Sequence, residues 1–96
     1  MTAKSMILLT IISEAMLEAI LADEIMQLGA KGYTVTDARG RGTHGVRRGN
    51  WTAGGNVRFD VVGDAELCAR IVARLKEVYE RDYGLLMYTS PVELQN

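Results

Sequence analysis

The sequence has little of several residue types, and each shortage excludes a class of protein. It holds a single cysteine, histidine, proline, tryptophan and phenylalanine in 96 residues. One cysteine rules out a disulfide framework and a cysteine-based zinc site, and it fits a reducing compartment, so we expect a cytoplasmic protein. The longest uncharged apolar stretch, Met6 to Ile12, is too short to cross a bilayer. The length suits one core, and we expect a single domain over residues 1–96.

Net charge is also small, but the charges are unevenly placed. The formal net charge of −1 argues against coating of nucleic acid or membrane by bulk charge. The segment from Ala38 to Phe59 nevertheless carries five arginines and the histidine, with no acidic residue. The rest of the chain has six basic and twelve acidic residues. A mildly acidic body therefore bears one basic segment, which is the most informative part of the sequence.

The pattern of apolar residues predicts four strands and two helices. We expect strands over Met6–Ile12, Tyr33–Arg39, Asn56–Val62 and Leu85–Thr89 (the last ended by Pro91), one helix from an N-cap at Ser13 to Gly29, and another after an N-cap at Asp64. The predicted helix faces are Met16, Leu17, Ile20, Leu21 and Leu28 in the first, and Leu67, Ile71, Leu75 and Val78 in the second. This order predicts an α+β, ferredoxin-like βαββαβ fold, with an antiparallel sheet and both helices on one face.

The second face of the predicted sheet is left uncovered by the helices. It still carries leucine, threonine and tyrosine side chains. An exposed apolar face of this size usually meets another subunit, so we expect an oligomer.

The segment from Gly40 to Gly55 holds six glycines and no continuous apolar run, which predicts a long loop. Glycines let backbone N–H groups approach an anion closely, and arginines add bidentate donors that match phosphate or carboxylate. The composition suits a phosphate-bearing ligand, and it equally suits a solvated hairpin tip. Neither a Walker A pattern nor a dinucleotide-binding glycine motif is present.

Candidates for catalysis and for other kinds of binding are weak. His44 has no carboxylate within the ten residues that follow it, so we expect no catalytic residue and no enzyme. Cys68 is expected to be a small buried hydrophobe, and we expect no metal site. RNA binding would need stacking aromatics on the third strand, which has only Phe59. Two alternatives remain: a trimer of the metal-tolerance type that binds no nucleotide, and an RNA-binding module.

Two stretches carry a resemblance to a known family. Thr34-Val35-Thr36-Asp37-Ala38-Arg39-Gly40-Arg41-Gly42 and Thr89-Ser90-Pro91-Val92-Glu93 closely resemble the PII signal-transduction proteins, and the likeness runs from about Ser5 to Glu93. The resemblance implies a ferredoxin-like homotrimer without enzymatic activity. It implies a protruding T-loop at about residues 40–55, which reports the ligand state to a partner, and adenine nucleotides in clefts between subunits.

Further segments resemble the PII-like branch linked to inorganic carbon, which includes carboxysome-associated PII proteins and regulators of bicarbonate transporters. They are Asp82-Tyr83-Gly84 and Gly42-Thr43-His44-Gly45-Val46-Arg47. Tyr83-Gly84-Leu85-Leu86 stands where the PII pattern has Gly-Asp-Gly-Lys, so the phosphate-binding lysine is absent. The resemblance implies ADP or AMP rather than a tightly bound cofactor, with cyclic AMP and ATP as further candidates, and bicarbonate as second ligand. It also implies a protein target such as a bicarbonate transporter, association with the carboxysome or inner membrane through that partner, and no nucleic acid.

The residues expected to hold these ligands follow from the resemblance and from their side chains. For the nucleotide they are Thr36, Asp37, Arg39, Gly42, Thr43, His44, Arg47, Arg48, Asp60, Val62, Gly84, Leu85 and Leu86. For bicarbonate they are Gly40, Arg41, Gly42 and Arg58. Asp37 and Asp60 lie where a carboxylate could pair with an arginine or meet a ribose hydroxyl, and Leu85 and Leu86 could pack on the adenine.

Overall fold

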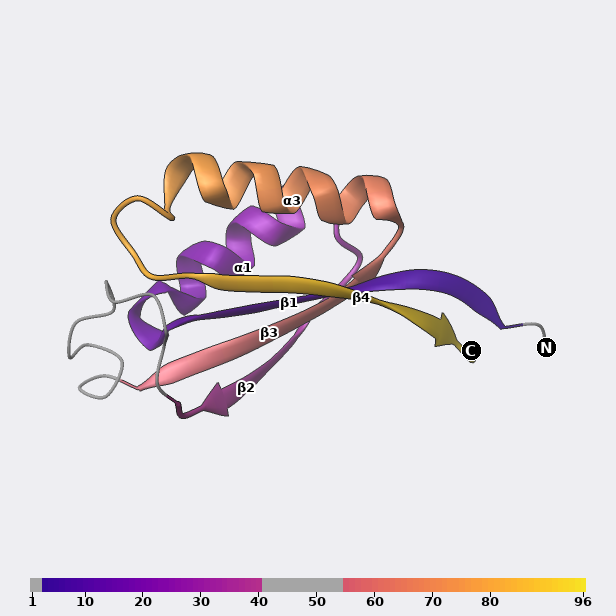
Figure 1. The fold of residues 1–96 in the computed structure, drawn as a ribbon, viewed down its shortest axis with the longest axis horizontal. Coiled ribbons are helices and arrows are strands. Elements are labelled where there is room, and N and C mark those ends of the chain that lie inside the picture. The colour runs from indigo at the N-terminus through magenta and orange to yellow at the C-terminus, as the bar shows by residue number, and fades with distance from the viewer. Residues whose placement is uncertain (1–2, 41–54) are drawn as a thin grey trace.

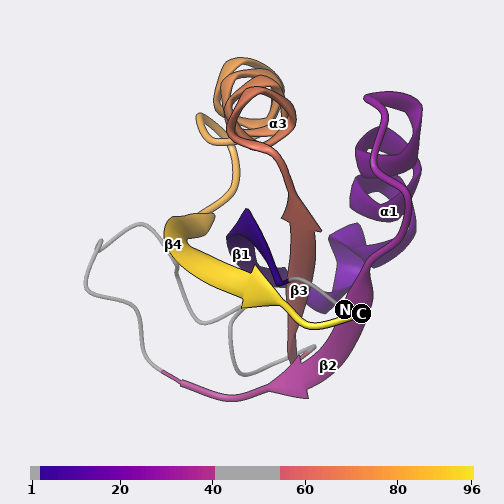
Figure 2. The ribbon, with the colours of Figure 1, turned by 90° about the vertical axis from the view of Figure 1, so that its right-hand side faces the viewer.

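The computed structural model describes residues 3–40 and 55–96 and confirms the ferredoxin-like order of elements (Figure 1). The elements are β1 (Lys4–Glu14), a 3-10 turn η1 (Ala15–Leu17), α1 (Glu18–Gln27), β2 (Thr34–Ala38), β3 (Asn56–Gly63), α3 (Ala65–Val78) and β4 (Leu86–Leu94). The strands form one antiparallel sheet in the order β2-β3-β1-β4, and both helices lie on the same side of it (Figure 2). No helix in the described ranges is long and apolar enough to span a membrane.

The central strands β1 and β3 are held in register by the apolar residues that they bury. Ile11 lies opposite Phe59 and Leu9 lies opposite Val61, and all four side chains are buried under the helices. Because side chains alternate along a strand, a slip of one residue would turn this whole set toward water. The apolar pattern therefore fixes which face of the sheet each remaining residue occupies.

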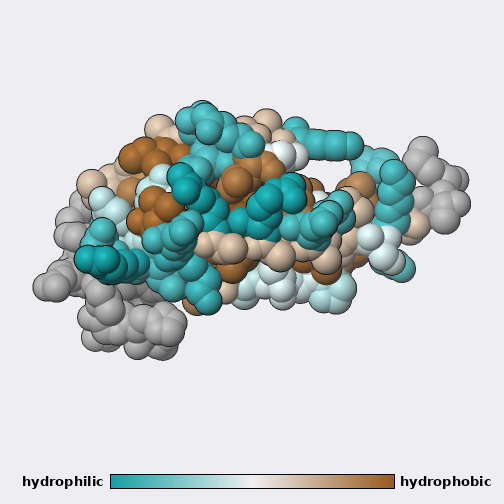
Figure 3. All heavy atoms as spheres, turned by 90° about the horizontal axis from the view of Figure 1, so that it is seen from above, coloured by the Kyte–Doolittle hydropathy of each residue, from teal (hydrophilic) through white to brown (hydrophobic). Residues whose placement is uncertain are grey.

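The helices complete the core with a narrow stripe of buried side chains. Leu21 and Ile25 of α1 and Ile71 and Leu75 of α3 are fully buried. The Asp64 carboxylate caps α3 by accepting a hydrogen bond from the Leu67 N–H at 2.8 Å, which confirms the predicted N-cap. On their outer side the helices are largely polar, with separate apolar areas (Figure 3).

The opposite face of the sheet, which we call the open face, has no helix against it (Figure 2). Cross-strand pairs place Thr10 between Asp60 and Tyr88, and Leu8 between Val62 and Ser90. Tyr88 and Val62 are among the most exposed large apolar side chains of the described residues. The expected uncovered face with leucine, threonine and tyrosine side chains is therefore confirmed.

Two predicted boundaries were wrong because strand pairing extends further than local signals suggest. Ser13 is not an N-cap: it lies in β1, and its hydroxyl donates to the Glu14 carbonyl oxygen while Glu14 pairs with Asn56 of β3. Pro91 does not end the last strand, which continues to Leu94. Since β4 bonds to β1 alone, proline there loses no ladder hydrogen bond if its nitrogen faces the free edge.

The predicted helix faces were too wide by three residues. Met16, Ile20 and Val78 were expected to face the core, yet all three are exposed, Met16 by 72% of its surface. Met16 lies in the 3-10 turn, where the 3.6-residue period that placed it does not hold, and Val78 is the final residue of α3. The other predicted positions are buried, except Leu28, which is partly buried. Ile25, which the predicted face left out, is fully buried.

Of the glycines that the structure describes, Gly63 leaves the least space for a Cβ atom. It ends β3 directly before α3, and a Cβ at this position would lie 2.7 Å from Cδ2 of Leu67. We expect Gly63→Ala to lower the free energy of unfolding by about 1–3 kcal/mol, because Leu67 must leave its packed position. Gly32→Ala is the matched control, since a Cβ there meets nothing within 4 Å, and its unfolding free energy should stay within about 1 kcal/mol of wild type. Equal denaturant midpoints for the two variants would contradict the packing argument.

Candidate functional site

The two ends of the β2–β3 connection emerge beside each other at one end of the sheet. Ala38 pairs with Asn56, and the chain continues to Gly40 on one side and returns through Gly55 on the other. The Gly55 carbonyl oxygen accepts a hydrogen bond from the Ala15 N–H at 3.0 Å, which ties the returning chain to η1. The predicted residues Arg41, Gly42, Thr43, His44, Arg47 and Arg48 lie outside the described residues.

A hydrogen-bonded cluster of Thr10, Asp60 and Arg58 lies on the open face. Arg58 is two residues from Asn56, and Asp60 lies further along β3, opposite Thr34 at the start of β2. The Thr10 hydroxyl donates to Oδ1 of Asp60 at 2.8 Å, across the β1–β3 pairing. Nε of Arg58 donates to the same carboxylate, at 3.2 Å to Oδ1 and 3.3 Å to Oδ2. The carboxylate is therefore held from two directions, and it fixes the guanidinium in turn.

The three members of this cluster differ sharply in exposure. Thr10 is completely buried, whereas the side chains of Arg58 and Asp60 remain 41% and 30% exposed. Because a half-exposed ion pair is worth little for stability, the pair adds only modestly to the fold. Its charged groups remain accessible to a small ligand, while the threonine acts only through Asp60.

The predicted residues of β2 lie on both faces of the strand that borders the cluster. Thr36 is opposite Arg58 and shares the open face with it. Asp37 is opposite Val57 and so projects from the helix side of this edge strand, where it is exposed. Arg39 and Gly40 follow the strand, and both are exposed. The structure thus brings Thr36 next to Arg58 and Asp60 and places Asp37 on the other side of the sheet.

The predicted residues around β4 also divide between the core and the open face. Leu86 is opposite Ile12, which is itself opposite Arg58, so Leu86 lies in the same row of the open face as the guanidinium. Leu85 is 5% exposed and packs in the hydrophobic core with Phe59, after the turn at Gly84. Val62 lies on the open face, two residues beyond Asp60.

Thr10 is the residue of this cluster that sequence reasoning missed. It lies within the apolar stretch that predicted the first strand, where it resembles any other β-branched strand residue. The available signal was its position in the alternation of side chains along the strand. Thr10 lies between Leu9 and Ile11, so it points to the face away from the core. Its partner on β3 could not be identified without the strand register.

Two alternative kinds of site find little support among the described residues. The ring of Phe59 is fully buried beneath the helices, so it cannot stack on a nucleic-acid base as the RNA-binding alternative requires. Within residues 3–40 and 55–96, no three His, Cys, Asp or Glu side chains gather as a group that could hold a metal ion.

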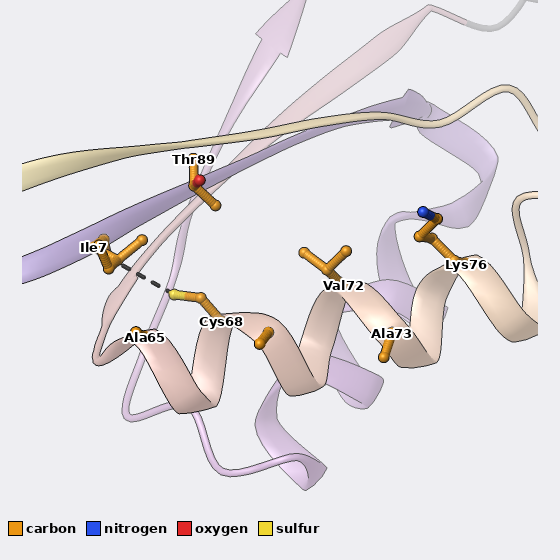
Figure 4. A pocket seen from close by; sticks show the side chains of 8 residues that line it. Ile7, Ala65, Cys68, Val72, Ala73, Lys76 and Thr89 are labelled. Carbon is orange, nitrogen blue, oxygen red and sulfur yellow. Dashed lines mark hydrogen bonds between the residues drawn. The ribbon is translucent and has the colours of Figure 1, made fainter.

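An apolar groove runs between α3 and the neighbouring strands β1 and β4 (Figure 4). Its volume is about 480 Å³, and Ile7, Cys68, Val72, Lys76 and Thr89 line it together with three alanines. The Cys68 sulfur lies 3.8 Å from the Ile7 carbonyl oxygen, and burial raises the pKa of the thiol. Cys68 is 2% exposed, so the expectation of a small buried hydrophobe is confirmed.

The four-stranded antiparallel sheet with both helices on one face defines a small ferredoxin-like α+β domain, and comparison with known families agrees. The chain belongs to the nitrogen regulatory protein P-II family, whose model matches residues 6–94. A PII-like signalling protein from Thermus thermophilus is 36% identical, with a TM-score of 0.83, over 98% of this chain and 92% of that one.

More distant structures share the same fold. CPII from Thiomonas intermedia K12, a nitrogen regulatory PII-like protein bound to ADP, AMP and bicarbonate, is 18% identical with a TM-score of 0.81. That match covers 99% of this chain and 98% of CPII. CPII bound to ADP, AMP and acetate matches at 16% identity with a TM-score of 0.84, over 100% of this chain and 94% of that one.

A second cluster of ionisable groups lies on the helix side, away from the loop base. Glu24 of α1 accepts a hydrogen bond from the Tyr79 hydroxyl at 2.8 Å and from Nε of Arg74 at 3.3 Å. The Tyr79 hydrogen bond lowers the pKa of Glu24, and the Arg74 guanidinium acts in the same direction. Burial raises the pKa of Tyr79, so its hydroxyl stays protonated as the donor. This cluster joins the two helices and has a structural role.

The lowered pKa of Glu24 makes this helix contact sensitive to acid. The contact stabilises the fold above the ordinary pKa of a glutamate, and this stability is lost as the pH falls through the lowered pKa. We expect Glu24→Gln to reduce the free energy of unfolding at neutral pH by about 1 kcal/mol, with the difference vanishing in strong acid. Denaturant titrations at several pH values measure this. Glu80→Gln, an exposed control, should follow the wild-type pH profile; a constant deficit for Glu24→Gln would contradict the role of its charge.

Proposed function

We propose that this protein is a non-enzymatic sensor that binds ADP or AMP at the interfaces between subunits and responds to bicarbonate. The observation that supports this proposal best is the partly exposed Arg58–Asp60 pair, which Thr10 holds in place and whose arginine is two residues from the start of β3. In the same family fold, CPII has been seen with adenine nucleotides together with bicarbonate or acetate. The bidentate donors of a guanidinium suit such anions.

The proposed nucleotide contacts come from the sheet with its margins and from the loop. Thr36, Asp37, Arg39, Asp60, Val62, Gly84, Leu85 and Leu86 belong to the described sheet and its margins, and Gly42, Thr43, His44, Arg47 and Arg48 to the loop. Bicarbonate is assigned to Gly40, Arg41, Gly42 and Arg58. Since Leu85 packs in the core of its own subunit, Leu86 is the better placed of the two leucines for contact with an adenine.

The proposed output is a ligand-dependent change in the surface that loop residues 40–55 offer to a protein target. A ligand shifts such an equilibrium only by its difference in affinity between the two loop states. We propose a cytoplasmic protein in inorganic-carbon metabolism, with a bicarbonate transporter or a carboxysome component as the class of target. The resemblance of the loop motif to the inorganic-carbon branch supports this assignment.

We also propose that the open face mediates assembly into a homotrimer. Tyr88 is 46% exposed on this face and is flanked by Thr10, whose polar hydrogen is already used within the protomer. Burial of the face would therefore remove apolar surface from water without leaving the threonine or its carboxylate unpaired.

Nucleotide binding is tested by calorimetry with AMP, ADP, ATP and cyclic AMP, each with and without bicarbonate. AMP or ADP should bind more tightly than ATP by about tenfold, because the lysine that serves a longer phosphate chain is absent. Arg47→Ala should weaken the tightest nucleotide by a similar factor. Arg70→Ala is the control, since Nε of Arg70 donates to the Leu28 carbonyl oxygen on the helix side. Absence of heat with all four nucleotides would overturn the proposal.

The oligomeric state is tested by sedimentation equilibrium on the wild-type chain and two variants. The wild type should sediment at three times the mass of one 10.6 kDa chain. Tyr88→Glu should yield monomers because it puts a charge into the proposed interface, whereas Met16→Glu, at a more exposed apolar residue on the helix side, should leave the mass unchanged. A monomeric wild type, or an unchanged mass for Tyr88→Glu, would contradict the assignment of this face.

A further inference from the structure

The Arg58–Asp60 pair offers hydrogen-bond donors and an acceptor side by side. Within the described residues, the guanidinium bonds to Asp60 through Nε, so its two Nη groups remain for another partner. Oδ1 of Asp60 accepts hydrogen bonds from the Thr10 hydroxyl and from Nε of Arg58. Oδ2 accepts only from Nε of Arg58, at 3.3 Å. Oδ2 therefore keeps the greater capacity to accept a further hydrogen bond.

We propose that Asp60 makes the anion response selective for bicarbonate, with Thr10 as its positioning residue. In this arrangement Asp60 accepts the hydrogen bond of the bicarbonate O–H while Arg58 donates to the two remaining oxygens. The inference rests on the proposed function, because it assumes that Arg58 takes part in holding bicarbonate. It adds two things: a specificity role for Asp60 and a role for Thr10, which lies outside the proposed ligand contacts.

The selectivity follows from one difference between small planar anions. Bicarbonate carries two acceptor oxygens and one O–H donor, whereas acetate has a methyl group in place of that donor. A guanidinium alone would bind both anions equally well, since it donates hydrogen bonds to the two oxygens that both anions have. A carboxylate beside the guanidinium repels an anion that cannot donate and forms a charge-assisted hydrogen bond with one that can. The pair of side chains thus distinguishes ligands of equal charge and similar shape.

Thr10 holds the Asp60 carboxylate in the orientation that this selection requires. Its hydroxyl is buried and lies directly opposite Asp60, so it can act on a ligand only through the carboxylate. By donating to Oδ1 at 2.8 Å it fixes the rotation of the carboxylate, which sets the direction of Oδ2. The carboxylate contacts Nε of Arg58 through both oxygens, at 3.2 and 3.3 Å, and without the Thr10 hydrogen bond it would be free to rotate about that contact. The buried threonine therefore preserves the acceptor that bicarbonate needs.

The test compares bicarbonate with acetate by calorimetry, in a sealed cell at slightly alkaline pH and constant ionic strength, on protein saturated with ADP. Wild-type protein should prefer bicarbonate by about tenfold, the effect of one hydrogen bond to a charged group. Asp60→Asn should weaken bicarbonate and strengthen acetate, bringing the ratio close to one. Thr10→Val, which keeps the shape of the side chain, should lower the ratio about threefold. Circular dichroism and thermal melting confirm that each variant is folded.

Matched controls separate selectivity from a general loss of structure. Asp23→Asn on α1 and Thr89→Val in the α3 groove should retain the wild-type ratio, since both lie on the helix side. Equal weakening of both anions in Asp60→Asn, an unchanged ratio in that variant, or a wild type that binds acetate as well as bicarbonate would overturn the inference. If ADP and AMP give no heat, the proposed function fails, and the same anion titrations on ligand-free protein then decide the selectivity separately.

Discussion

The register between β1 and β3 is the constraint on which the rest of the structure depends. It sets Ile11 opposite Phe59 on the covered face and Thr10 opposite Asp60 on the open face. Burial of the apolar pair holds the register, because a slip of one residue would expose Phe59 and push Asp60 into the core. The same apolar contacts that stabilise the domain therefore position its charged pair. A change of register would displace the buried apolar pair and the charged pair together.

The two faces of the sheet differ in what they bury and what they leave accessible. The helix-covered face is packed with fully buried apolar side chains, which offer few groups for binding a ligand. On the open face, Asp60 is paired within its own protomer while remaining partly exposed. A polar group satisfied in this way can lie near another subunit or a ligand without a large desolvation cost.

Membership of the P-II family explains the fold of this chain, but it does not by itself identify a ligand. CPII matches this fold at 16% and 18% identity in its two complexes, so very different side chains build the same sheet and helices. Function depends on the residues placed on such a scaffold, and a fold can host several kinds of site. In this chain, the described residues show an arginine held by a carboxylate on the sheet, and the sequence of the β2–β3 connection is rich in arginine and glycine.

The sequence by itself determined the order of elements, the cap at Asp64 and the two faces of β3, because each depends on periodicity or on a hydrogen bond between near neighbours. It misjudged Ser13 and Pro91, where pairing with a distant strand outweighed a local helix or turn preference. Only the tertiary structure decided that Thr10 meets Asp60, 50 residues away along the chain. Cross-strand register is set by burial of the whole core at once, so a local pattern can assign a residue to a face but cannot choose its partner.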